Sequence, residues 1–349
     1  MASNRYYASF VPGMQKTVEA IVRERLPDVT IEKLLDGAVL FKTQCTYDKL
    51  NFFCFNNVFA VIGVIESPSA ETALEAHMRA ACRSGPHPVI AENTKKIRSF
   101  RIVCSRENTP AAVDEGVRRD TERYIAARSG LVPDRSRPDT EFWFLSRREG
   151  FSVFMKRLTR RGSFEKTLHP GELPPPLAYL LCRLSGPKPG DVAADPFCGY
   201  GAIPAEWIKR FPGARFYASD RDRKAVDYAR KKLAGNGGGR CEFRRADVYE
   251  LPSLLPPESL DAIITDPPWG LYSGAGGPAA GTVPMERFYA DIMEISAGLL
   301  KPGGTAVVLT ARQKELADGA ARTGKFEIRD AIPVLLSGKK AAVFVLRKG

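Results

Sequence analysis

The segment Asp191-Val-Ala-Ala-Asp-Pro-Phe-Cys-Gly-Tyr-Gly201 decides the fold of the second half of the chain. It begins as a short apolar strand, Asp191–Asp195, and turns through a loop with two glycines into a predicted helix, Gly201–Phe211. A second strand, Arg215–Ser219, follows after a short connection. Two strands joined through a helix run parallel in one sheet. This segment therefore predicts an α/β domain built on a parallel sheet.

The same alternation continues to the end of the chain. Helices are predicted at Asp222–Ala234 and Met285–Leu300. The further predicted strands are Cys241–Arg245, Leu260–Thr265 and Thr305–Thr310, followed by a strand pair, Glu327–Leu335 and Ala341–Leu346, around Ser337-Gly338. Short apolar strands that alternate with helices predict a sheet with helices on both faces. A terminal strand pair in place of a last strand–helix unit differs from the dinucleotide-binding pattern.

Three aspartates follow consecutive strands of this predicted sheet, at the edge where open α/β sheets bind ligands. Asp195 ends the first strand, where its carboxylate can accept a hydrogen bond from a ligand ammonium group. Asp220 ends the second strand and can accept both hydroxyls of a ribose, and Asp247, after the third, can accept from an adenine amine. Each aspartate taken alone is better explained as a solvated strand end or a helix cap. Their common register favours a nucleoside ligand.

Gly199 and Gly201 lie between the first strand and its helix. A residue without a Cβ lets the backbone bend sharply and approach a ligand closely, although a G-x-G sequence is also found in simple turns. A dinucleotide-binding loop would continue to a third glycine at position 204, where this chain has Pro204. A nicotinamide cofactor is therefore not favoured.

The most specific motif of the chain is Asp266-Pro-Pro-Trp-Gly270, at the end of the strand Leu260–Thr265. An exocyclic base amine is a poor nucleophile because its lone pair is delocalised into the ring. The carboxylate of Asp266 and the carbonyl of Pro267 can each accept one amine hydrogen, which orients the nitrogen. Trp269 offers a flat face on which a base can stack. The alternative is a plain Asp-Pro-Pro turn; the following Gly274–Gly281, rich in Gly and Ala, predicts a lid.

The first half of the chain reads as two smaller α/β units. The first is ferredoxin-like, with strands at Tyr6–Phe10, Thr30–Leu34, Ala38–Lys42 and Val58–Ile65 and helices at Gln15–Arg25 and Thr46–Asn57. The second has helices at Ala70–Ala81 and Thr109–Ser129 and strands at Ser99–Cys104, Glu141–Leu145 and Phe151–Leu158. A Pro-rich segment, Pro170–Pro176, marks the boundary with the second half. We therefore expect three domains, at residues 1–66, 67–165 and 166–349.

The charge of the chain suggests a polyanionic partner. The formal net charge is +12 and the pI is about 9.4. Seven basic residues lie between Arg147 and Lys166, against two acidic ones. The candidate contacts chosen from this run are Arg147, Arg148, Arg157, Arg160 and Arg161. A solvated charged face is an equally good interpretation of the run taken alone.

Composition excludes several other classes of protein. The seven cysteines include no C-x-x-C pair, and the three histidines are not in metal-ligand spacing. We expect free thiols in a reducing cytoplasm and no structural zinc. No apolar run approaches the roughly 20 residues that cross a bilayer, and no secretory signal is recognised near residue 1. We also expect a monomer, because no exposed heptad pattern is present.

The second half of the chain resembles the Rossmann-like S-adenosylmethionine-dependent methyltransferases that modify amines. Within them it is similar to the RNA guanine-N2 methyltransferases that carry an N-terminal THUMP domain. The residues that match are Asp195-Pro-Phe-Cys-Gly-Tyr-Gly201, Ile203-Pro-Ala-Glu206, Ser219-Asp220, Ala246-Asp247, Asp266-Pro-Pro-Trp-Gly270 and the linker Leu173–Ala178. Phe100–Phe154 resembles THUMP more diffusely, and Phe10–Gly13 with Gly37–Phe41 resembles the ferredoxin-like domain that precedes it.

The resemblance implies a seven-stranded mixed sheet with an antiparallel last strand, S-adenosyl-L-methionine as cofactor, and tRNA or ribosomal RNA as substrate. It implies that Asp266, Pro267 and Trp269 are catalytic. The implied cofactor contacts are Asp195, Phe197, Gly199, Gly201, Asp220 and Asp247. The basic run near Arg147 becomes a candidate RNA contact. The expected reaction is methylation of the N2 amine of a guanine in structured RNA, with tRNA preferred.

Two residues depart from the family pattern. Tyr200 and Ala202 stand where the family usually has small hydroxyl residues beside the methionine part of the cofactor. The bulk of Tyr200 predicts a narrower pocket. These departures keep open a non-catalytic RNA-binding protein whose cofactor site has decayed. Adenine-N6 methylation, which uses the same Asp-Pro-Pro-Trp chemistry, and methylation of ribosomal RNA, on which some members of the family act, are further alternatives.

Overall fold

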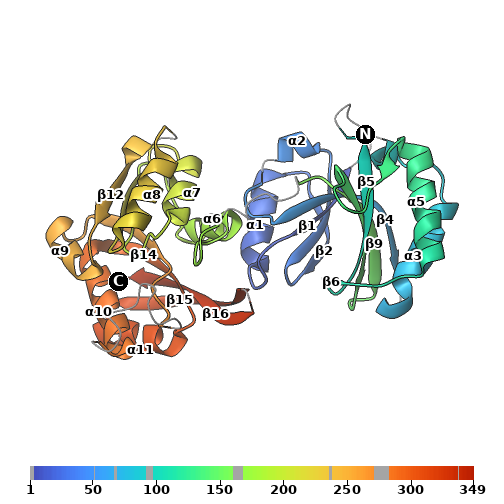
Figure 1. Ribbon diagram of the computed structural model, residues 1–349. Coiled ribbons are helices and arrows are strands. Elements are labelled where there is room, and N and C mark those ends of the chain that lie inside the picture. The colour runs from blue at the N-terminus through green and yellow to red at the C-terminus, as the bar shows by residue number, and fades with distance from the viewer. Residues whose placement is uncertain are drawn as a thin grey trace. The chain divides into compact units, whose positions relative to one another are not determined.

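The computed structural model describes residues 4–50, 52–66, 69–91, 97–159, 168–235, 238–270, 283–336 and 338–349 (Figure 1). The chain divides into two compact units. The N-terminal unit contains Met1–Phe10 and Glu19–Ser163, and the C-terminal unit contains Val11–Val18 and Phe164–Gly349.

The N-terminal unit is built on one nine-stranded sheet. Its strands lie in the order β2 (Thr30–Leu35), β3 (Ala38–Thr43), β1 (Asn4–Ser9), β4 (Asn57–Glu66), β9 (Phe151–Arg157), β8 (Thr140–Arg147), β5 (Ser99–Arg106) and β6 (Thr109–Pro110), with β7 (Val132–Pro133) also pairing with β5. The antiparallel pair of β4 with β9 makes the sheet continuous between the first 66 residues and those that follow. Both predicted N-terminal units therefore share this sheet.

Helices cover this sheet through apolar side chains. The longest that lie wholly in this unit are α3 (Ala70–Arg83) and α5 (Glu115–Ser129), and the short ones are α2 (Tyr47–Leu50) and α4 (Pro88–Ala91). The first residues of α1 (Gln15–Arg25) are assigned to the C-terminal unit and the rest to this one. The core between α3, α5 and the sheet includes Leu74, Ile125 and Phe142. The bounds predicted for α1 are confirmed, because its apolar residues recur with the helical period.

The predicted helix Thr46–Asn57 is wrong. Only the single turn of α2 is helical, and Cys54 and Phe55 that follow it are buried in irregular backbone. The amide of Asn56 donates to the carbonyl of Ser9 at 2.7 Å, which starts the pairing of β4 instead of continuing a helix. Tertiary burial of an aromatic-rich segment has overridden its local pattern.

The predicted start of the helix Thr109–Ser129 is also wrong. Thr109–Pro110 forms β6 and pairs with the end of β5. The helix α5 begins at Glu115 because the carboxylate of Asp114 accepts a hydrogen bond from the amide of Val117 at 3.0 Å. A side-chain cap of this kind satisfies an unpaired amide of the first helical turn.

The C-terminal unit is built on a seven-stranded sheet. Its order is β12 (Cys241–Arg245), β11 (Arg215–Asp220), β10 (Val192–Asp195), β13 (Leu260–Thr265), β14 (Leu300–Thr310), β16 (Lys339–Lys348) and β15 (Phe326–Leu336). The strands from β12 to β14 are parallel, whereas β16 is antiparallel to both β14 and β15. The expected mixed sheet with an antiparallel last strand is confirmed.

The larger helices of this unit are α6 (Pro175–Leu184), α7 (Ala202–Arg210), α8 (Arg223–Leu233), α10 (Met285–Leu299) and α11 (Gln313–Thr323), and α9 (Leu251–Leu254) is a single turn. Sequence patterns did not predict α6, which begins inside the Pro-rich segment, or α11. Proline is tolerated in the first turn of α6 because the first helical amides have no partner in the helix. In the described part of the chain no helix has the length and apolarity to cross a membrane.

The helices α10 and α11 pack closely because of Gly319. A Cβ at this residue would lie 3.0 Å from the carbonyl oxygen of Tyr289 and 3.1 Å from the Cα of Ala290. Real Cβ atoms are seldom this close to backbone. The backbone of α11 at Gly319 therefore rests directly on the turn of α10 that carries Tyr289.

Candidate active site

The predicted site residues lie together at one edge of the C-terminal sheet. Asp195 and Asp220 are the last residues of β10 and β11, and Asp266 follows the last residue of β13. These strands are parallel, so their carboxyl ends lie at the same edge of the sheet. β10 lies between β11 and β13. After β10 the chain adds β11 and β12 on one side, and it then crosses to the other side of β10 to add β13 and β14. Ligands of open α/β sheets bind at this kind of position.

Asp195 is a buried carboxylate with one oxygen engaged. Its residue is 2% exposed. The Oδ1 atom accepts hydrogen bonds from the Thr265 hydroxyl at 2.6 Å and from the Phe197 amide at 3.0 Å. Burial raises the pKa of Asp195 to about 7, and the nearby charge of Asp220 adds to the rise while the two hydrogen bonds oppose it. No donor among the described residues reaches Oδ2, which is left for a ligand.

The loop after Asp195 is tied to the end of β11. The Cys198 amide donates to the Ser219 carbonyl at 2.9 Å, and the Gly199 amide donates to Oδ2 of Asp220 at 2.9 Å. A Cβ at Gly199 would meet no atom within 4 Å, so the loop has open space beside it there. At Gly201 a Cβ would lie 2.8 Å from the Cβ of Ala229 on α8, so this glycine is needed for packing.

Asp220 receives a backbone amide on each carboxylate oxygen. Besides the bond from Gly199, its Oδ1 accepts from the Asp222 amide at 2.9 Å. Burial raises its pKa, and the two amides oppose this rise. A carboxylate has about four lone-pair directions, so both oxygens can still accept a ligand hydroxyl.

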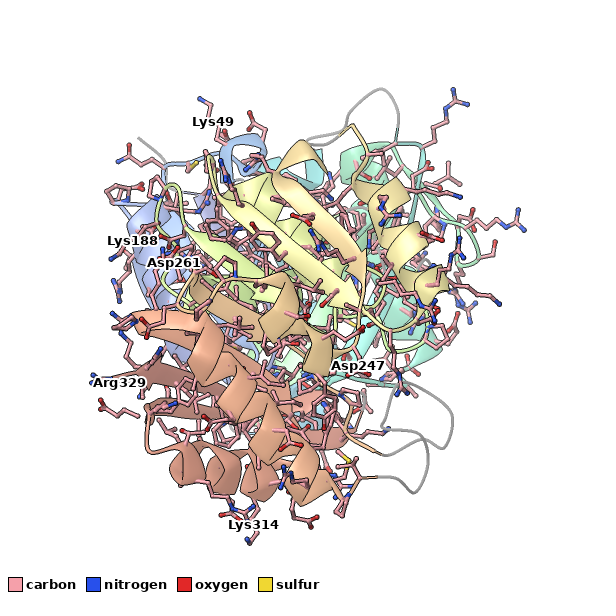
Figure 2. The ribbon with its side chains drawn as sticks, turned by 90° about the vertical axis from the view of Figure 1, so that its left-hand side faces the viewer. Lys49, Lys188, Asp247, Asp261, Lys314 and Arg329 are labelled. Atoms are coloured by element: carbon pink, nitrogen blue, oxygen red, sulfur yellow. The ribbon has the colours of Figure 1, made fainter. Side chains whose placement is uncertain are left out.

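Asp247 caps the short 3-10 helix Val248–Glu250 (Figure 2). Its side chain accepts from the Tyr249 amide at 3.2 Å, and its own amide donates to the Glu250 carboxylate at 2.7 Å. This reciprocal arrangement is a capping box. It holds the carboxylate of Asp247 at the carboxyl edge of the sheet.

Phe197 belongs to the loop after Asp195 and packs toward α10. Its ring packs edge-on against Phe288, with centroids 5.8 Å apart, and it is partly buried against the core. Its amide donates to Asp195, so the ring and the carboxylate are positioned by the same turn.

Asp266 and Trp269 are held together within the loop that follows β13. The indole Nε1–H of Trp269 donates to Oδ1 of Asp266 at 2.9 Å. Burial of the carboxyl group raises the pKa of Asp266 to about 8; the hydrogen bond from Trp269 opposes this rise, and the charge of Asp195 adds to it. No donor among the described residues reaches Oδ2. Asp266 therefore keeps one oxygen free.

Sequence reasoning missed four residues around these groups. Thr265 bonds to Asp195, and Tyr289 and Arg312 bond to carbonyls of the Asp266 loop. Thr310 bonds to Tyr289 and to the Arg312 amide. Thr265 directly precedes the Asp266 motif, and Arg312 follows the end of β14, so both occupy strand ends where a site was expected. The contact of Tyr289 depends on how α10 lies on the sheet, and no local signal marks it.

Comparison with known proteins identifies the family. Residues 163–341 match the model of a family described as RMKL-like, methyltransferase domain. A tRNA (guanine(6)-N2)-methyltransferase of Thermus thermophilus is 32% identical over 255 residues, which is 72% of this chain and 72% of the relative. This chain belongs to the RMKL-like methyltransferases, in the RNA guanine-N2 methyltransferase family.

Two further comparisons extend beyond the catalytic half of this methyltransferase. The crystal structure of TrmN from Thermus thermophilus superposes with a TM-score of 0.81 at 27% identity, over 99% of this chain and 100% of TrmN. The mouse tRNA (guanine(6)-N(2))-methyltransferase THUMP3 is 25% identical over 310 residues, which is 82% of this chain and 60% of the mouse protein. The similarity therefore includes the N-terminal unit.

Tyr200, one of the two departures from the family pattern, takes part in an aromatic cluster. Its ring stacks on His169 with centroids 4.0 Å apart and an interplanar angle of 10°. Tyr228 on α8 lies edge-on to both rings. Ala202 is the first residue of α7. One face of the Tyr200 ring is thus covered by His169, in the segment that precedes α6.

Among the candidate RNA contacts that the structure describes, Arg157 lies apart from Arg147 and Arg148. Arg147, at the end of β8, is 5% exposed and forms an ion pair with Glu149 at 2.9 Å. Arg148 is exposed in the adjacent turn. Arg157 ends β9, six residues along the strand from the turn, and pairs with Glu141 at 3.1 Å. At about 3.3 Å per residue, the ends of this strand are roughly 20 Å apart. Arg160, Arg161 and the predicted lid Gly274–Gly281 lie outside the described residues.

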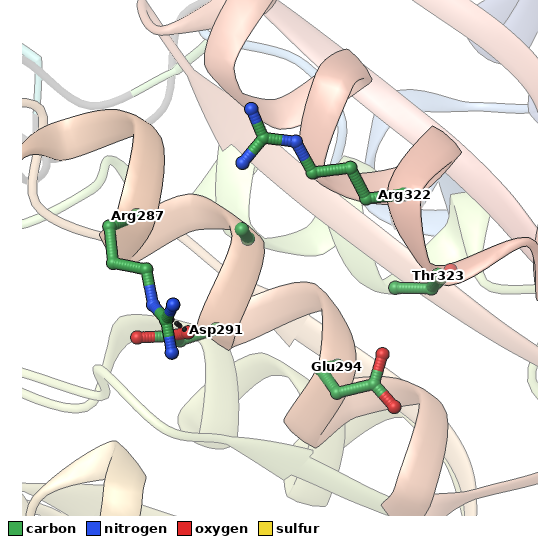
Figure 3. A pocket seen from close by; sticks show the side chains of 7 residues that line it. Arg287, Asp291, Glu294, Arg322 and Thr323 are labelled. Carbon is green, nitrogen blue, oxygen red and sulfur yellow. Dashed lines mark ion pairs between the residues drawn. The ribbon is translucent and has the colours of Figure 1, made fainter.

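A surface pocket of about 250 Å³ lies between α10 and α11 (Figure 3). Its lining includes the ion pair of Arg287 with Asp291, and also Glu294, Arg322 and Thr323. None of the predicted catalytic or cofactor residues lines it. We do not assign it to the methyltransferase reaction. Among the described residues no group of three or more His, Cys, Asp or Glu side chains is arranged to hold a metal.

Proposed function

We propose that this methyltransferase transfers a methyl group from S-adenosyl-L-methionine to the N2 amine of a guanine in tRNA. One observation carries the proposal. Asp266, with one free carboxylate oxygen, stands at the same sheet edge as Asp195, and Thr265 between them bonds to the Asp195 side chain. A cofactor pocket and an amine-binding loop are thus joined across adjacent strands.

The residues at this edge fit the cofactor. The free Oδ2 of buried Asp195 suits the ammonium group of the methionine part, and Asp220 suits the ribose hydroxyls. The open space at Gly199 allows the ligand to lie against the loop, with Phe197 beside it. Asp247, held by its capping box, suits the adenine amine. Gly201 contributes by letting the loop pack against α8.

The residues of the Asp266 loop perform the steps that the protein controls. Asp266 and the carbonyl of Pro267 accept the two amine hydrogens and point the nitrogen lone pair toward the methyl group. Trp269 stacks on the base, which must leave its helix to reach the loop. The cofactor, when bound, supplies an electrophilic methyl group for direct in-line displacement. Burial raises the pKa of the Cys198 thiol well above its usual range, which suits a mechanism without a covalent enzyme intermediate.

The N-terminal unit is proposed to bind the RNA and deliver the base. The relatives that act on tRNA match residues in both halves of this chain. The division into a ferredoxin-like domain (1–66), a THUMP domain (67–165) and a methyltransferase domain (166–349) is kept as part of the proposal. Arg147, Arg148 and Arg157, with Arg160 and Arg161, remain predicted RNA contacts. A monomer and a cytoplasmic location also remain predictions.

The function is tested by incubating the purified full chain with unmodified tRNA and labelled S-adenosyl-L-methionine. Mass spectrometry of the digested nucleosides should show N2-methylguanosine. N6-methyladenosine instead would establish the adenine alternative, and label in ribosomal RNA but not in tRNA would change the substrate. If no methylation is seen, calorimetric titration of the protein with S-adenosyl-L-methionine distinguishes two explanations. No binding would indicate a decayed cofactor site, and binding would indicate that the wrong RNA was supplied.

A matched pair of variants locates the chemistry. Asp266→Ala should abolish methylation while RNA binding stays within about twofold of the wild type. Asp261→Ala is the control, because Asp261 lies near the start of β13 and pairs with Lys301 at 2.7 Å, at the other end of the strand. Equal activity of Asp266→Ala and the wild type would reject the proposed mechanism.

A further inference from the structure

Successive carbonyls of the Asp266 loop have different partners. The carbonyl of Pro268 accepts a hydrogen bond from the Tyr289 hydroxyl at 3.3 Å. The carbonyl of Trp269 accepts one from Nε of Arg312 at 2.8 Å. No donor among the described residues reaches the carbonyl of Pro267. Two of the three neighbouring acceptors are thus taken by the protein, and one is free.

Tyr289 is fixed by its own surroundings. Its residue is 0% exposed, and its hydroxyl lies 2.6 Å from Oγ1 of Thr310 at the end of β14. A hydroxyl has one hydrogen to donate. If Tyr289 donates to Pro268, Thr310 must donate to Tyr289, and the Thr310 oxygen can accept from the Arg312 amide, which lies 2.9 Å away. With this assignment the chain of bonds runs in one direction, from β14 to the loop.

Arg312 is fixed from the other side. Its Nη1 atom pairs with the Glu315 carboxylate at 3.2 Å, one turn along α11. The guanidinium group is planar and rigid, so fixing one edge on Glu315 sets the direction of Nε toward Trp269. Arg312 and Tyr289 thus hold the loop from α11 and α10.

We propose that Tyr289 and Arg312 are positioning residues for methyl transfer. By occupying the carbonyls of Pro268 and Trp269, they leave the Pro267 carbonyl as the main-chain acceptor that, with Asp266, receives the N2 amine. This inference rests on the proposed function. Neither residue touches the reacting atoms. Their effect is on the direction of the Pro267 carbonyl, and displacement of a reacting group by about 1 Å lowers a rate on the order of 100-fold.

The test compares two conservative variants with two matched controls. Tyr289→Phe removes only the hydroxyl, and Arg312→Lys keeps the charge without the planar fork. Tyr179→Phe removes a hydroxyl from another buried tyrosine, on α6. Arg240→Lys is the control for the guanidinium, because Arg240 also donates to backbone carbonyls, including Ile208 at 2.6 Å.

The first measurement is the single-turnover rate of tRNA methylation at saturating cofactor. Tyr289→Phe and Arg312→Lys should be slower by roughly 10- to 100-fold, with cofactor affinity within about twofold of the wild type. The two controls should keep the wild-type rate. Variant rates within twofold of the wild type, or equal losses in the controls, would overturn the inference. The wild-type rate in the same assay reports separately on the proposed function.

The second measurement is one that a purely structural role would not change. The probe is the tRNA that the wild type methylates, prepared with either guanosine or inosine at the methylated position, since inosine lacks the N2 amine. The wild type should bind the guanosine tRNA roughly 10-fold more tightly than the inosine tRNA, because inosine leaves the Asp266 carboxylate and the Pro267 carbonyl unpaired. In both variants this preference should fall toward unity. An unchanged preference would overturn the inference.

If Tyr289→Phe does not fold, Thr310→Val replaces it, because the Thr310 hydroxyl orients both Tyr289 and the Arg312 amide. The same loss of rate and of guanosine preference is expected. A folded Thr310→Val variant with wild-type values for both would overturn the inference.

Discussion

The Thr265 hydroxyl donates a 2.6 Å hydrogen bond to the buried carboxylate of Asp195. It thereby connects β13, which leads into the loop proposed to bind the amine, with β10, which ends in the residue proposed to bind the cofactor ammonium group. The bond lowers the pKa of Asp195 against the effect of burial, which raises it to about 7. Thr265 therefore influences how much of Asp195 is ionised near neutral pH.

Thr265→Val is expected to weaken cofactor binding about tenfold at pH 7, because loss of the hydrogen bond raises the pKa of Asp195 further and leaves less carboxylate to bind a cation. At pH 9 Asp195 is ionised in both proteins, so the difference should shrink. Calorimetric titration at the two pH values measures it. Thr121→Val, which removes another buried hydroxyl on α5, is the control. Equal affinities at pH 7 would contradict the prediction.

Asp266→Asn is expected to stabilise the protein at high pH. Burial raises the folded-state pKa of Asp266 from its usual value of 3.8 to about 8. Between these values the folded state holds a proton that the unfolded state has lost, so the free energy of unfolding falls as pH rises. Asparagine does not titrate, so it causes no such fall in the free energy of unfolding, and its side-chain oxygen can still accept the hydrogen bond from Trp269. Its advantage over the wild type should grow by on the order of 2–5 kcal/mol between pH 4 and pH 9. Calorimetric unfolding at both pH values tests this; a constant difference would contradict it.

The pH dependence of activity should follow the same carboxyl group. Only ionised Asp266 favours the positive charge that develops on the amine, so kcat/KM for tRNA should rise with pH and reach half its maximum near the pKa of about 8. A rate profile from pH 6 to pH 9.5 measures this. A flat profile would mean that Asp266 is ionised over this whole pH range, which would contradict a pKa of about 8.

Trp269→Phe separates stacking from hydrogen bonding. Phenylalanine keeps a flat face but removes the indole N–H that lowers the pKa of Asp266. The activity profile should therefore shift to higher pH, with RNA binding nearly unchanged. Trp269→Ala should also lose base stacking, about 1–3 kcal/mol of binding free energy. The control is Trp143→Phe, because Trp143 donates to Glu141 in the same way at 3.0 Å in the N-terminal sheet. If the pH midpoint of activity is the same in Trp269→Phe and the wild type, the Trp269 hydrogen bond does not set the pKa of Asp266.

Tyr200→Ala is expected to leave cofactor affinity within about threefold of the wild type. The Tyr200 ring is stacked on His169 at 4.0 Å, so truncation removes an aromatic contact with the segment before α6. Calorimetric titration of the variant checks this. Tightening by more than about tenfold would show that the tyrosine does narrow the pocket, as its bulk suggested from the sequence.

The sequence predicted the strands of the catalytic sheet well because they are short apolar runs that end in conspicuous polar residues. Asp195, Asp220 and Asp266 stand at strand ends, and parallel strands bring such residues to one edge without further information. The partners of these residues were not predictable in the same way. The contact of Thr265 with Asp195 requires that β13 lie beside β10, which is a property of the whole sheet.

Local sequence signals for a helix start were present at three places, and the prediction did not use them. Asp247 is followed three residues later by Glu250, the pattern of a capping box, and the structure has that cap. Asp114 precedes α5 as its cap, and the periodicity used to extend the helix back to Thr109 does not locate a start. Pro175 at the start of α6 was taken for linker although proline suits a first helical turn.

The missing Cβ of Gly319 gives the catalytic unit a sensitive position outside the active site. A methyl group there would press on the carbonyl oxygen of Tyr289, 3.0 Å away, and on Ala290. The side chain of Tyr289 bonds to the loop proposed to receive the amine, so the pressure would be transmitted through one turn of α10. A random screen for inactive enzymes is expected to recover substitutions at Gly319, and a list of ligand contacts would not explain them.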